Sequence, residues 1–328
     1  MNAAPPLMLA PLAGFTDAPF RLLCSQGGAA RVYTEMASAA GLAHGSGPTL
    51  RLLDTMPGEA TVHAQIFGNN EDDIAAATRI VASLKRFAAI DLNTGCPMPR
   101  IRAEGSGSAL LESPEKIYRM LRAMKAESGG TPITLKTRPG PRPSQENMLE
   151  IVACAEEAGV SEIALHARFA SRAHGGPPLL DKLAECVKAA KVPVIGNGGV
   201  VDRASCEAMA ATGVAGIMIG RAALGDPWIF RRLAAPEGEA GGFPDAFETF
   251  ARHVGLVKEF AAMTNAAHPD IQPVDVDAYV SARFRLHLYR YFAGMRGAAA
   301  MRREMNGISS LAGAEAAVAG LAGLRTVS

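Results

Sequence analysis

The stretch VPVIGNGGVVDRASCEAMAATGVAGIMIGR, residues 192–221, decides the fold. It begins with an apolar run over 192–196, shows helical periodicity over 202–212, and ends with a second apolar run over 216–219. Near-continuous apolar runs of this length are typical of parallel strands that are covered on both faces. The unit therefore predicts a strand, a crossover helix and a second parallel strand.

The same alternation continues toward the N-terminus through the first two thirds of the chain. Further strands are expected at residues 7–10, 31–34, 62–66, 88–93, 133–136 and 162–166, and amphipathic helices at 70–86, 114–127 and 145–158. Ser113-Pro114 and Asp202 are helix start signals, and Gly159 and Gly213 stand where helices should stop. Eight alternations favour a closed (β/α)8 TIM barrel in the α/β class. A Rossmann sheet is the second choice, because no GxGxxG follows the first strand.

Composition bounds the class of protein. The chain has 328 residues, 48% hydrophobic and 20% charged, which suits one barrel plus a small extra domain. The formal charge of +1 means that positive charge for a polyanionic partner must be local. Five scattered cysteines without metal-ligand spacing argue against a metal site or disulfides. With neither a signal peptide over residues 1–6 nor a membrane span, we expect a cytoplasmic protein, and we also expect a monomer.

The composition changes at PEGEAGGFP, residues 236–244, which is the expected linker. We expect a catalytic barrel domain over 1–235 and a C-terminal helical bundle over 245–328. The pattern in this second part is helical to about residue 323, with a break at 270–273.

Polar and small residues follow most of the expected strands, where the chemistry of a barrel collects. Small residues after the seventh and eighth strands suit a phosphate, and Arg221 supplies a positive charge; each glycine alone could instead serve a tight turn. Lys136 could stabilise negative charge on a reduced flavin or could cap a loop carbonyl. The residues on this rim are Pro11, Leu12, Ala13, Gln65, Asn93, Cys96, Lys136, Arg138, His166, Arg168, Asn197, Gly198, Gly199, Gly220 and Arg221.

Cys96 differs from the other cysteines because it lies on a loop between Gly95 and Pro97, whereas the others mostly lie in expected helices. It is a candidate nucleophile or proton donor, and spacing alone does not choose between these roles. His166 and Arg168 share one face of a strand and could bind an anion or a base carbonyl.

Residues 281–303 contain six arginines, interleaved with aromatic residues, and no acid. This pattern suits RNA phosphates and bases, although a solvated helix face is equally compatible with it. The arginines are Arg283, Arg285, Arg290, Arg296, Arg302 and Arg303.

Together these motifs resemble the tRNA-dihydrouridine synthases, most of all the bacterial B type. The resemblance covers the whole barrel, and its most specific part is the cysteine-containing segment. The matching motifs are APLAGFTD (10–17), LNTGCP (92–97), GSGSALL (105–111), LKTR (135–138), NGG (197–199), MIGRAA (218–223) and PWIF (227–230).

The resemblance implies that the chain is an oxidoreductase that holds FMN, takes NADPH as reductant and reduces uridine in tRNA. In such enzymes the flavin gives a hydride to C6 and the loop cysteine, here Cys96, gives a proton to C5. The expected substrate-binding residues are Arg138, Arg168, Arg283, Arg285 and Arg290. Asn93, His166 and Arg168 would face uracil or flavin. The expected cofactor-binding residues are Pro11, Leu12, Ala13, Gln65, Asn93, Lys136, His166, Asn197, Gly198, Gly199, Gly220 and Arg221.

Three segments depart from the family pattern: Ala167 and Phe169 stand beside His166, Gly199 stands where an acid is common, and His174 stands where an aromatic is usual. Two other functions compete with the first. One is an FMN barrel acting on a free pyrimidine, such as a dihydroorotate dehydrogenase, which has no need of a basic tail. The other is an RNA-binding barrel without turnover, against which Cys96 and Lys136 argue.

Overall fold

Eight parallel strands close into a barrel in the computed structural model, which describes residues 4–236, 241–305 and 307–325. Each strand pairs with the next one around the ring, and the ring closes through pairing of β1 with β9 and of β2 with β4. The (β/α)8 fold is thereby confirmed. The barrel strands are β1 (Leu7–Leu9), β2 (Arg31–Tyr33), β4 (Thr61–Phe67), β5 (Ala89–Asn93), β6 (Ile133–Thr137), β7 (Glu162–His166), β8 (Val194–Asn197) and β9 (Gly216–Ile219).

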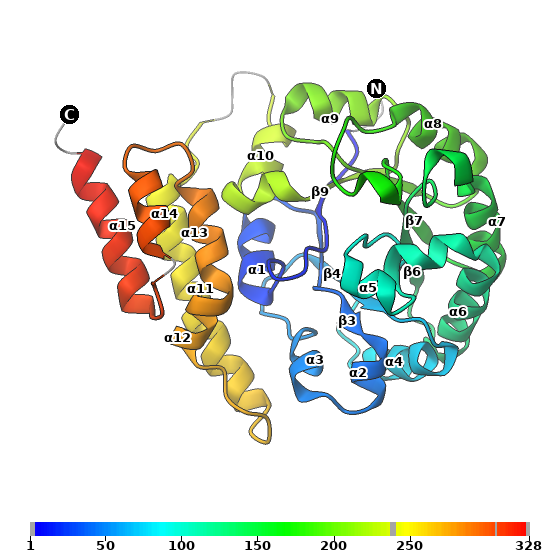
Figure 1. The fold of residues 1–328 in the computed structure, drawn as a ribbon, viewed down its shortest axis with the longest axis horizontal. Coiled ribbons are helices and arrows are strands. Elements are labelled where there is room, and N and C mark those ends of the chain that lie inside the picture. Colours follow the sequence, from blue (N-terminus) through cyan, green and yellow to red (C-terminus); the bar gives the residue numbers. More distant parts are fainter. Residues whose placement is uncertain (1–3, 237–240, 306, 326–328) are drawn as a thin grey trace.

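Helices surround this barrel (Figure 1). The longer ones are α1 (Ala18–Gln26), α4 (Glu71–Ser83), α6 (Pro114–Glu127), α7 (Met148–Ala158), α8 (Leu180–Ala189), α9 (Arg203–Ala210) and α10 (Ile229–Ala234). Shorter elements are the helices α2 (Ala39–Ala43), α3 (Gly47–Arg51) and α5 (Pro99–Ala103) and the 3-10 turns η1 (Gly107–Glu112), η2 (Pro143–Gln145), η3 (Ala170–Arg172) and η4 (Arg221–Gly225).

Local signals in the sequence account for several helix ends. The Ser113 side chain accepts a hydrogen bond from the backbone of Lys116, and Asp202 forms a capping box with Ser205. Gly159 ends α7 in the left-handed conformation, with φ of 87°. The helix expected over 70–86 stops earlier, at the end of α4, because Lys85 has a φ of 51° that a helix cannot contain.

Strand alternation sorts side chains between the inside and the outside of the barrel. Inside, an apolar layer consists of Met8, Ala10, Tyr33, Ala164, Ile195 and Met218. Alternate residues such as Leu92 point outward into the core under the helices. Two pairs at the carboxyl ends of the strands, Asn93 with Lys136 and His166 with Asn197, stand in register. The strand register therefore brings these polar side chains to one end of the barrel.

A helical bundle follows the barrel, and the described residues after 241 contain no strand. Its elements are α11 (Ala246–Ala267), α12 (Val276–Tyr279), the π-helical turn η5 (Val280–Phe284), α13 (Arg285–Tyr291), α14 (Ala298–Met305) and α15 (Leu311–Arg325). It packs beside α1 at one side of the barrel (Figure 1), where Phe260 joins a small core with Ala18, Leu22 and Met56. Residues 237–240 of the expected linker and the side chain of Arg302 lie outside the described residues.

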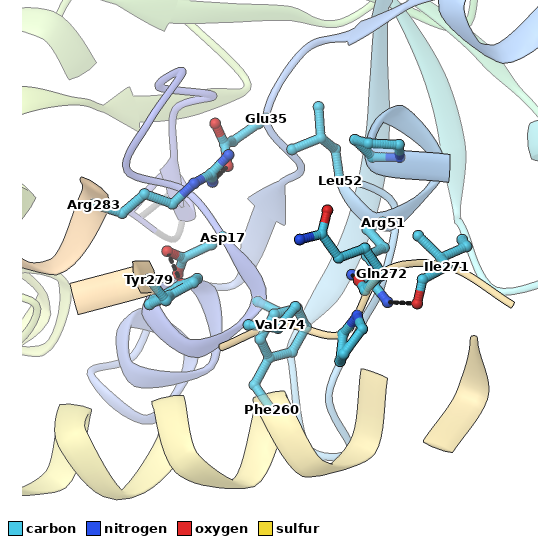
Figure 2. Close-up of a pocket in the computed structure, with 13 residues that line it drawn as sticks. Asp17, Glu35, Arg51, Leu52, Phe260, Ile271, Gln272, Val274, Tyr279 and Arg283 are labelled. Atoms are coloured by element: carbon cyan, nitrogen blue, oxygen red, sulfur yellow. Dashed lines mark hydrogen bonds and ion pairs between the residues drawn. The ribbon is translucent and has the colours of Figure 1, made fainter. Parts of the chain in front are cut away.

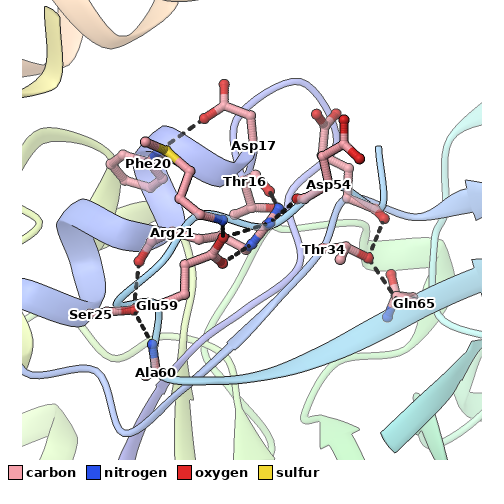
Figure 3. A network of polar contacts seen from close by, with 12 residues as sticks. Thr16, Asp17, Phe20, Arg21, Ser25, Thr34, Asp54, Glu59, Ala60 and Gln65 are labelled. Atoms are coloured by element: carbon pink, nitrogen blue, oxygen red, sulfur yellow. Dashed lines mark hydrogen bonds and ion pairs between the residues drawn. The ribbon is translucent and has the colours of Figure 1, made fainter. Parts of the chain in front are cut away.

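A buried arginine, Arg21, forms hydrogen bonds to several loop residues on the bundle side of the barrel (Figure 3). The Arg21 guanidinium donates to both Glu59 carboxylate oxygens, at 2.7 and 3.2 Å, and to the carbonyls of Thr16 and Asp54. Arg21 is 1% exposed, so this ion pair is screened little by solvent. Arg21 therefore has a structural role, because it joins the loop after β1 to the segment between α3 and β4.

The sequence pattern did not reveal the two-residue strand β3 (Ala37–Ser38), which pairs with β4. It is too short to show an alternation of apolar and polar residues. Within the described ranges, no helix is both long enough and apolar enough to span a membrane.

Candidate active site

A cavity of about 390 Å³ opens at the carboxyl ends of the barrel strands. This volume falls within the range of small-molecule sites. Sixteen of the residues expected from the sequence line it: Pro11, Leu12, Ala13, Gln65, Asn93, Cys96, Lys136, Arg138, His166, Arg168, Asn197, Gly198, Gly199, Gly220, Arg221 and Arg290. Segments as far apart in the sequence as the loop after β1 and helix α13 of the bundle thus share one site.

The lining of this cavity is strongly cationic. It contains no Asp or Glu among the residues that the structure describes, and it carries the five cations Lys136, Arg138, Arg168, Arg221 and Arg290. Burial is the main cause that lowers the pKa of Lys136, to about 8, and the neighbouring Arg138 lowers it further. A site with this charge favours an anionic ligand.

Lys136 is held in place by an amide. Its Nζ donates to Oδ1 of Asn197 at 2.9 Å, and Nδ2 of Asn197 donates to the carbonyl of Met218 at 2.8 Å. This chain of bonds fixes which end of the Asn197 amide faces the lysine. The ammonium group therefore stays at the cavity wall.

The loop that carries Cys96 is fixed on both sides. The backbone amides of Gly95 and Cys96 donate to Oδ1 of Asn93, at 3.1 and 2.9 Å. Nε of Arg138 donates to the carbonyl of Gly95 at 2.6 Å, and the amide of Ser108 donates to the carbonyl of Cys96 at 2.9 Å. Burial raises the pKa of the Cys96 thiol. A protonated thiol at the cavity wall can act as an acid.

His166 and Arg168 lie against the turn that follows β8. Arg168 contacts Nε2 of His166 at 3.3 Å, and its Nε donates to the carbonyl of Gly176 at 2.9 Å. Gly198 has a φ of 117°, and a Cβ at this position would lie 2.8 Å from the His166 ring and 3.0 Å from Arg168. Only glycine therefore fits here without displacing both side chains.

Two expected RNA-binding arginines lie elsewhere. Arg283 forms an ion pair with Glu35 and lines a second cavity, of about 270 Å³, between the barrel and the bundle. Figure 2 shows this pairing, together with the hydrogen bond from Tyr279 to Asp17. Arg285 is half-buried at the start of α13 and is not part of the lining of the first cavity. Arg290, by contrast, lies later on the same helix and reaches the barrel mouth.

Sequence reasoning missed other residues around the site. Met36 lines the cavity and accepts a bond from Asn93 Nδ2 at 3.6 Å, but its short neighbouring strand gave no signal. Asp91 lies directly beneath the cavity and bonds to Gln65. A signal for Asp91 was present in the sequence, because it stands two residues before Asn93 on one strand and so shares its inward face.

The barrel mouth combines a buried lysine and a loop cysteine with no acid among the described lining residues, so it favours an anionic ligand at the place where barrel enzymes have their active sites. Comparison with known proteins specifies the family. The model of the dihydrouridine synthase family matches residues 8–324. The chain therefore belongs to the dihydrouridine synthase family, and it is an oxidoreductase.

Curated relatives agree with this assignment. The chain is 38% identical over 231 residues to tRNA-dihydrouridine synthase B of Serratia marcescens, an alignment that covers 69% of this chain and 68% of the relative. It is 38% identical over 238 residues to the same-named protein of Yersinia pestis, covering 69% and 70%. It is 32% identical over 265 residues to the probable tRNA-dihydrouridine synthase of Aquifex aeolicus, covering 79% and 82%.

One solved structure shares the fold. An old yellow enzyme homologue from Zymomonas mobilis matches with a TM-score of 0.50 and 12% sequence identity, over 74% of this chain and 91% of that one. At this identity the likeness concerns the barrel fold alone.

Proposed function

We propose that this protein is a tRNA-dihydrouridine synthase that reduces the C5–C6 double bond of specific uridines in tRNA, with FMN as its cofactor and NAD(P)H as reductant. The observation that carries the proposal is that Cys96 and Lys136 line one cavity, with no acid among its described lining residues, in a member of this family. The names of the relatives support tRNA as the substrate.

The residues around the cavity fit FMN. FMN combines a phosphate with a flat ring system that has a polar edge, so it needs a cationic end, amide and ammonium partners, and an apolar wall. Arg221, with the glycine turns at Gly198, Gly199 and Gly220, would hold the phosphate. Gln65 and Lys136 would bind the ring edge, and Pro11, Leu12 and Ala13 would provide apolar contact. When bound, FMN reduced by NADPH supplies the hydride that adds to C6.

Cys96 would supply the proton. Its pKa is raised by burial, so the thiol is protonated at neutral pH and can donate a proton to C5 of the uracil. Asn93 keeps the loop in place through two backbone amides. His166, whose pKa is lowered far below its ordinary value mainly by burial, stays neutral and could hydrogen-bond either uracil or cofactor.

The bundle would bind the rest of the RNA. Arg290 on α13 is exposed and also lines the cavity, so a polyanion entering the barrel mouth passes it. Each part has its own hydrophobic cluster, which supports a catalytic domain over 1–235 and an RNA-binding domain over 245–328. Arg138 and Arg168, which contribute to the cationic wall, would face the flipped base.

The proposed function is tested by identifying the nucleoside that the enzyme produces. Purified protein with FMN and NADPH is incubated either with an unmodified tRNA transcript or with free uridine. The masses of the resulting nucleosides are then measured by mass spectrometry. We expect a nucleoside heavier than uridine by two hydrogen atoms from the transcript, because only the polyanion can use the cationic rim. Reduction of free uridine with equal efficiency would instead favour an enzyme of pyrimidine metabolism.

A further inference from the structure

A buried carboxylate lies beneath the candidate active site without lining it. Asp91 stands on β5, is 0% exposed and points into the barrel. Its Oδ2 accepts a hydrogen bond from Nε2 of Gln65 at 2.7 Å, and its Oδ1 accepts one from Oγ1 of Thr134 at 2.7 Å. Both partners come from the neighbouring strands β4 and β6. Because burying a carboxylate costs free energy, a buried and fully hydrogen-bonded Asp91 suggests a specific role for this residue.

The bonds continue upward from Asp91 to the cysteine loop. Oε1 of Gln65 accepts from Nδ2 of Asn93 at 2.8 Å. Oδ1 of Asn93 then accepts from the backbone amides of Gly95 and Cys96. The backbone amide of Gln65 donates to Oγ1 of Thr34 at 3.0 Å, a bond visible in Figure 3, which fixes the start of this chain. Asp91, Gln65, Asn93 and the Cys96 amide thus form one continuous line of hydrogen bonds.

The direction of every bond in this line is determined by its two ends. An ionised carboxylate only accepts, so Gln65 must turn its NH2 group toward Asp91. The carbonyl end of Gln65 then faces Asn93, which must donate its own NH2 group. The oxygen of Asn93 is left for the two backbone amides, which only donate. Every contact in the line therefore pairs one hydrogen-bond donor with one acceptor.

Other bonds of the loop hold its carbonyl groups. Arg138 holds the carbonyl of Gly95, and Ser108 holds that of Cys96. The two amides, in contrast, depend on Asn93, whose orientation depends in turn on Gln65 and Asp91.

We propose that Asp91 is a positioning residue for Cys96: it orients the Gln65 and Asn93 amides and through them fixes the backbone of the cysteine loop. The catalytic consequence rests on the proposed function, since it matters for turnover only if Cys96 is the acid. Burial raises the pKa of Asp91, to about 6, so the carboxylate is ionised at neutral pH, as the bonding pattern requires.

The experiment is hydrogen–deuterium exchange of the Gly95 and Cys96 amides in the purified full chain. Pro97 has no amide hydrogen, so the Cys96 signal is not mixed with that of the next residue. Asp91→Leu removes the hydrogen-bond acceptor of Gln65 at similar side-chain volume, whereas Asp91→Asn keeps an acceptor for Gln65. Thr134→Val removes the hydrogen bond from Thr134 to Asp91 and leaves the line from Asp91 to the Cys96 amide in place. We expect about tenfold faster exchange of both amides in Asp91→Leu, and rates within about threefold of wild type in Asp91→Asn and Thr134→Val.

Unchanged exchange in Asp91→Leu would overturn the proposal, as would equally fast exchange in Thr134→Val. If Asp91→Leu does not fold, Gln65→Met removes the hydrogen bonds of Gln65 to Asp91 and Asn93 instead, and it must accelerate exchange of the same two amides. A parallel turnover assay on tRNA should show a loss of kcat in Asp91→Leu that Asp91→Asn restores. Because exchange is read without substrate, a wild-type protein that reduces no uridine would refute the proposed function and leave the exchange result intact.

Discussion

At the scale of single residues, Lys136 shows how the barrel adjusts a charge. Burial and Arg138 lower its pKa to about 8, while Asp91 and Cys96 oppose this shift. A lysine with a lowered pKa carries its charge below that value and loses it above. The charge of the cavity wall therefore changes within an accessible pH range.

We predict that FMN binding weakens as the pH rises through about 8, because the ammonium at the cavity wall loses its proton. The expected loss is about tenfold, the worth of one charge-assisted hydrogen bond. Fluorescence titration of FMN across this range measures it. Lys136→Met should bind weakly at every pH with a flat profile. A flat profile in the wild type, or an unchanged fall in Lys136→Met, would show that another group controls binding.

At the scale of elements, the surroundings of an arginine decide whether it could contact the proposed RNA. Arg283 lies on η5 and is engaged by Glu35, whose other carboxylate oxygen accepts from the amide of Gly14 at 2.5 Å. Arg290 lies on α13, exposed, at the mouth of the cavity. The two arginines belong to one basic stretch of sequence but have different surroundings.

We predict that Arg290→Ala weakens tRNA binding several-fold and lowers the slope of log affinity against log salt by about one, the loss of one phosphate contact. Arg283→Ala, its matched control, should instead lower the melting temperature, because Glu35 is left buried without its partner. Binding isotherms at several salt concentrations and thermal melts separate the two effects. The reverse assignment, with the salt slope changed only by Arg283→Ala, would place the RNA on the other cavity.

The elements were predictable to different degrees. Helix α6 begins and ends as the sequence indicates, because Ser113-Pro114 is a local start signal. Helix α7 begins at Met148, later than expected, because Pro143 to Gln145 form the separate turn η2. Short elements such as α2 and β3 escaped prediction, since their form depends on tertiary contacts rather than on periodicity.

At the scale of the whole molecule, the barrel gathers residues from almost every strand at one rim, and the bundle adds Arg290. The rim residues were predictable because the carboxyl ends of barrel strands converge by geometry. The positions of Arg283 and Arg285 were not, because composition says that a stretch is basic but not which neighbours its side chains meet. The role proposed for Asp91 likewise needs the bonds between strands, which the sequence does not contain.

The central claim is that Cys96 delivers a proton inside this cavity, and single-turnover reduction of a tRNA transcript by Cys96→Ala tests it most directly. Cys154→Ala, on the outer helix α7, is the matched control. We predict that Cys96→Ala forms dihydrouridine at least about a hundredfold more slowly while it binds FMN as the wild type does, and that Cys154→Ala is unaffected. Dihydrouridine formation at the wild-type rate in Cys96→Ala would contradict the account.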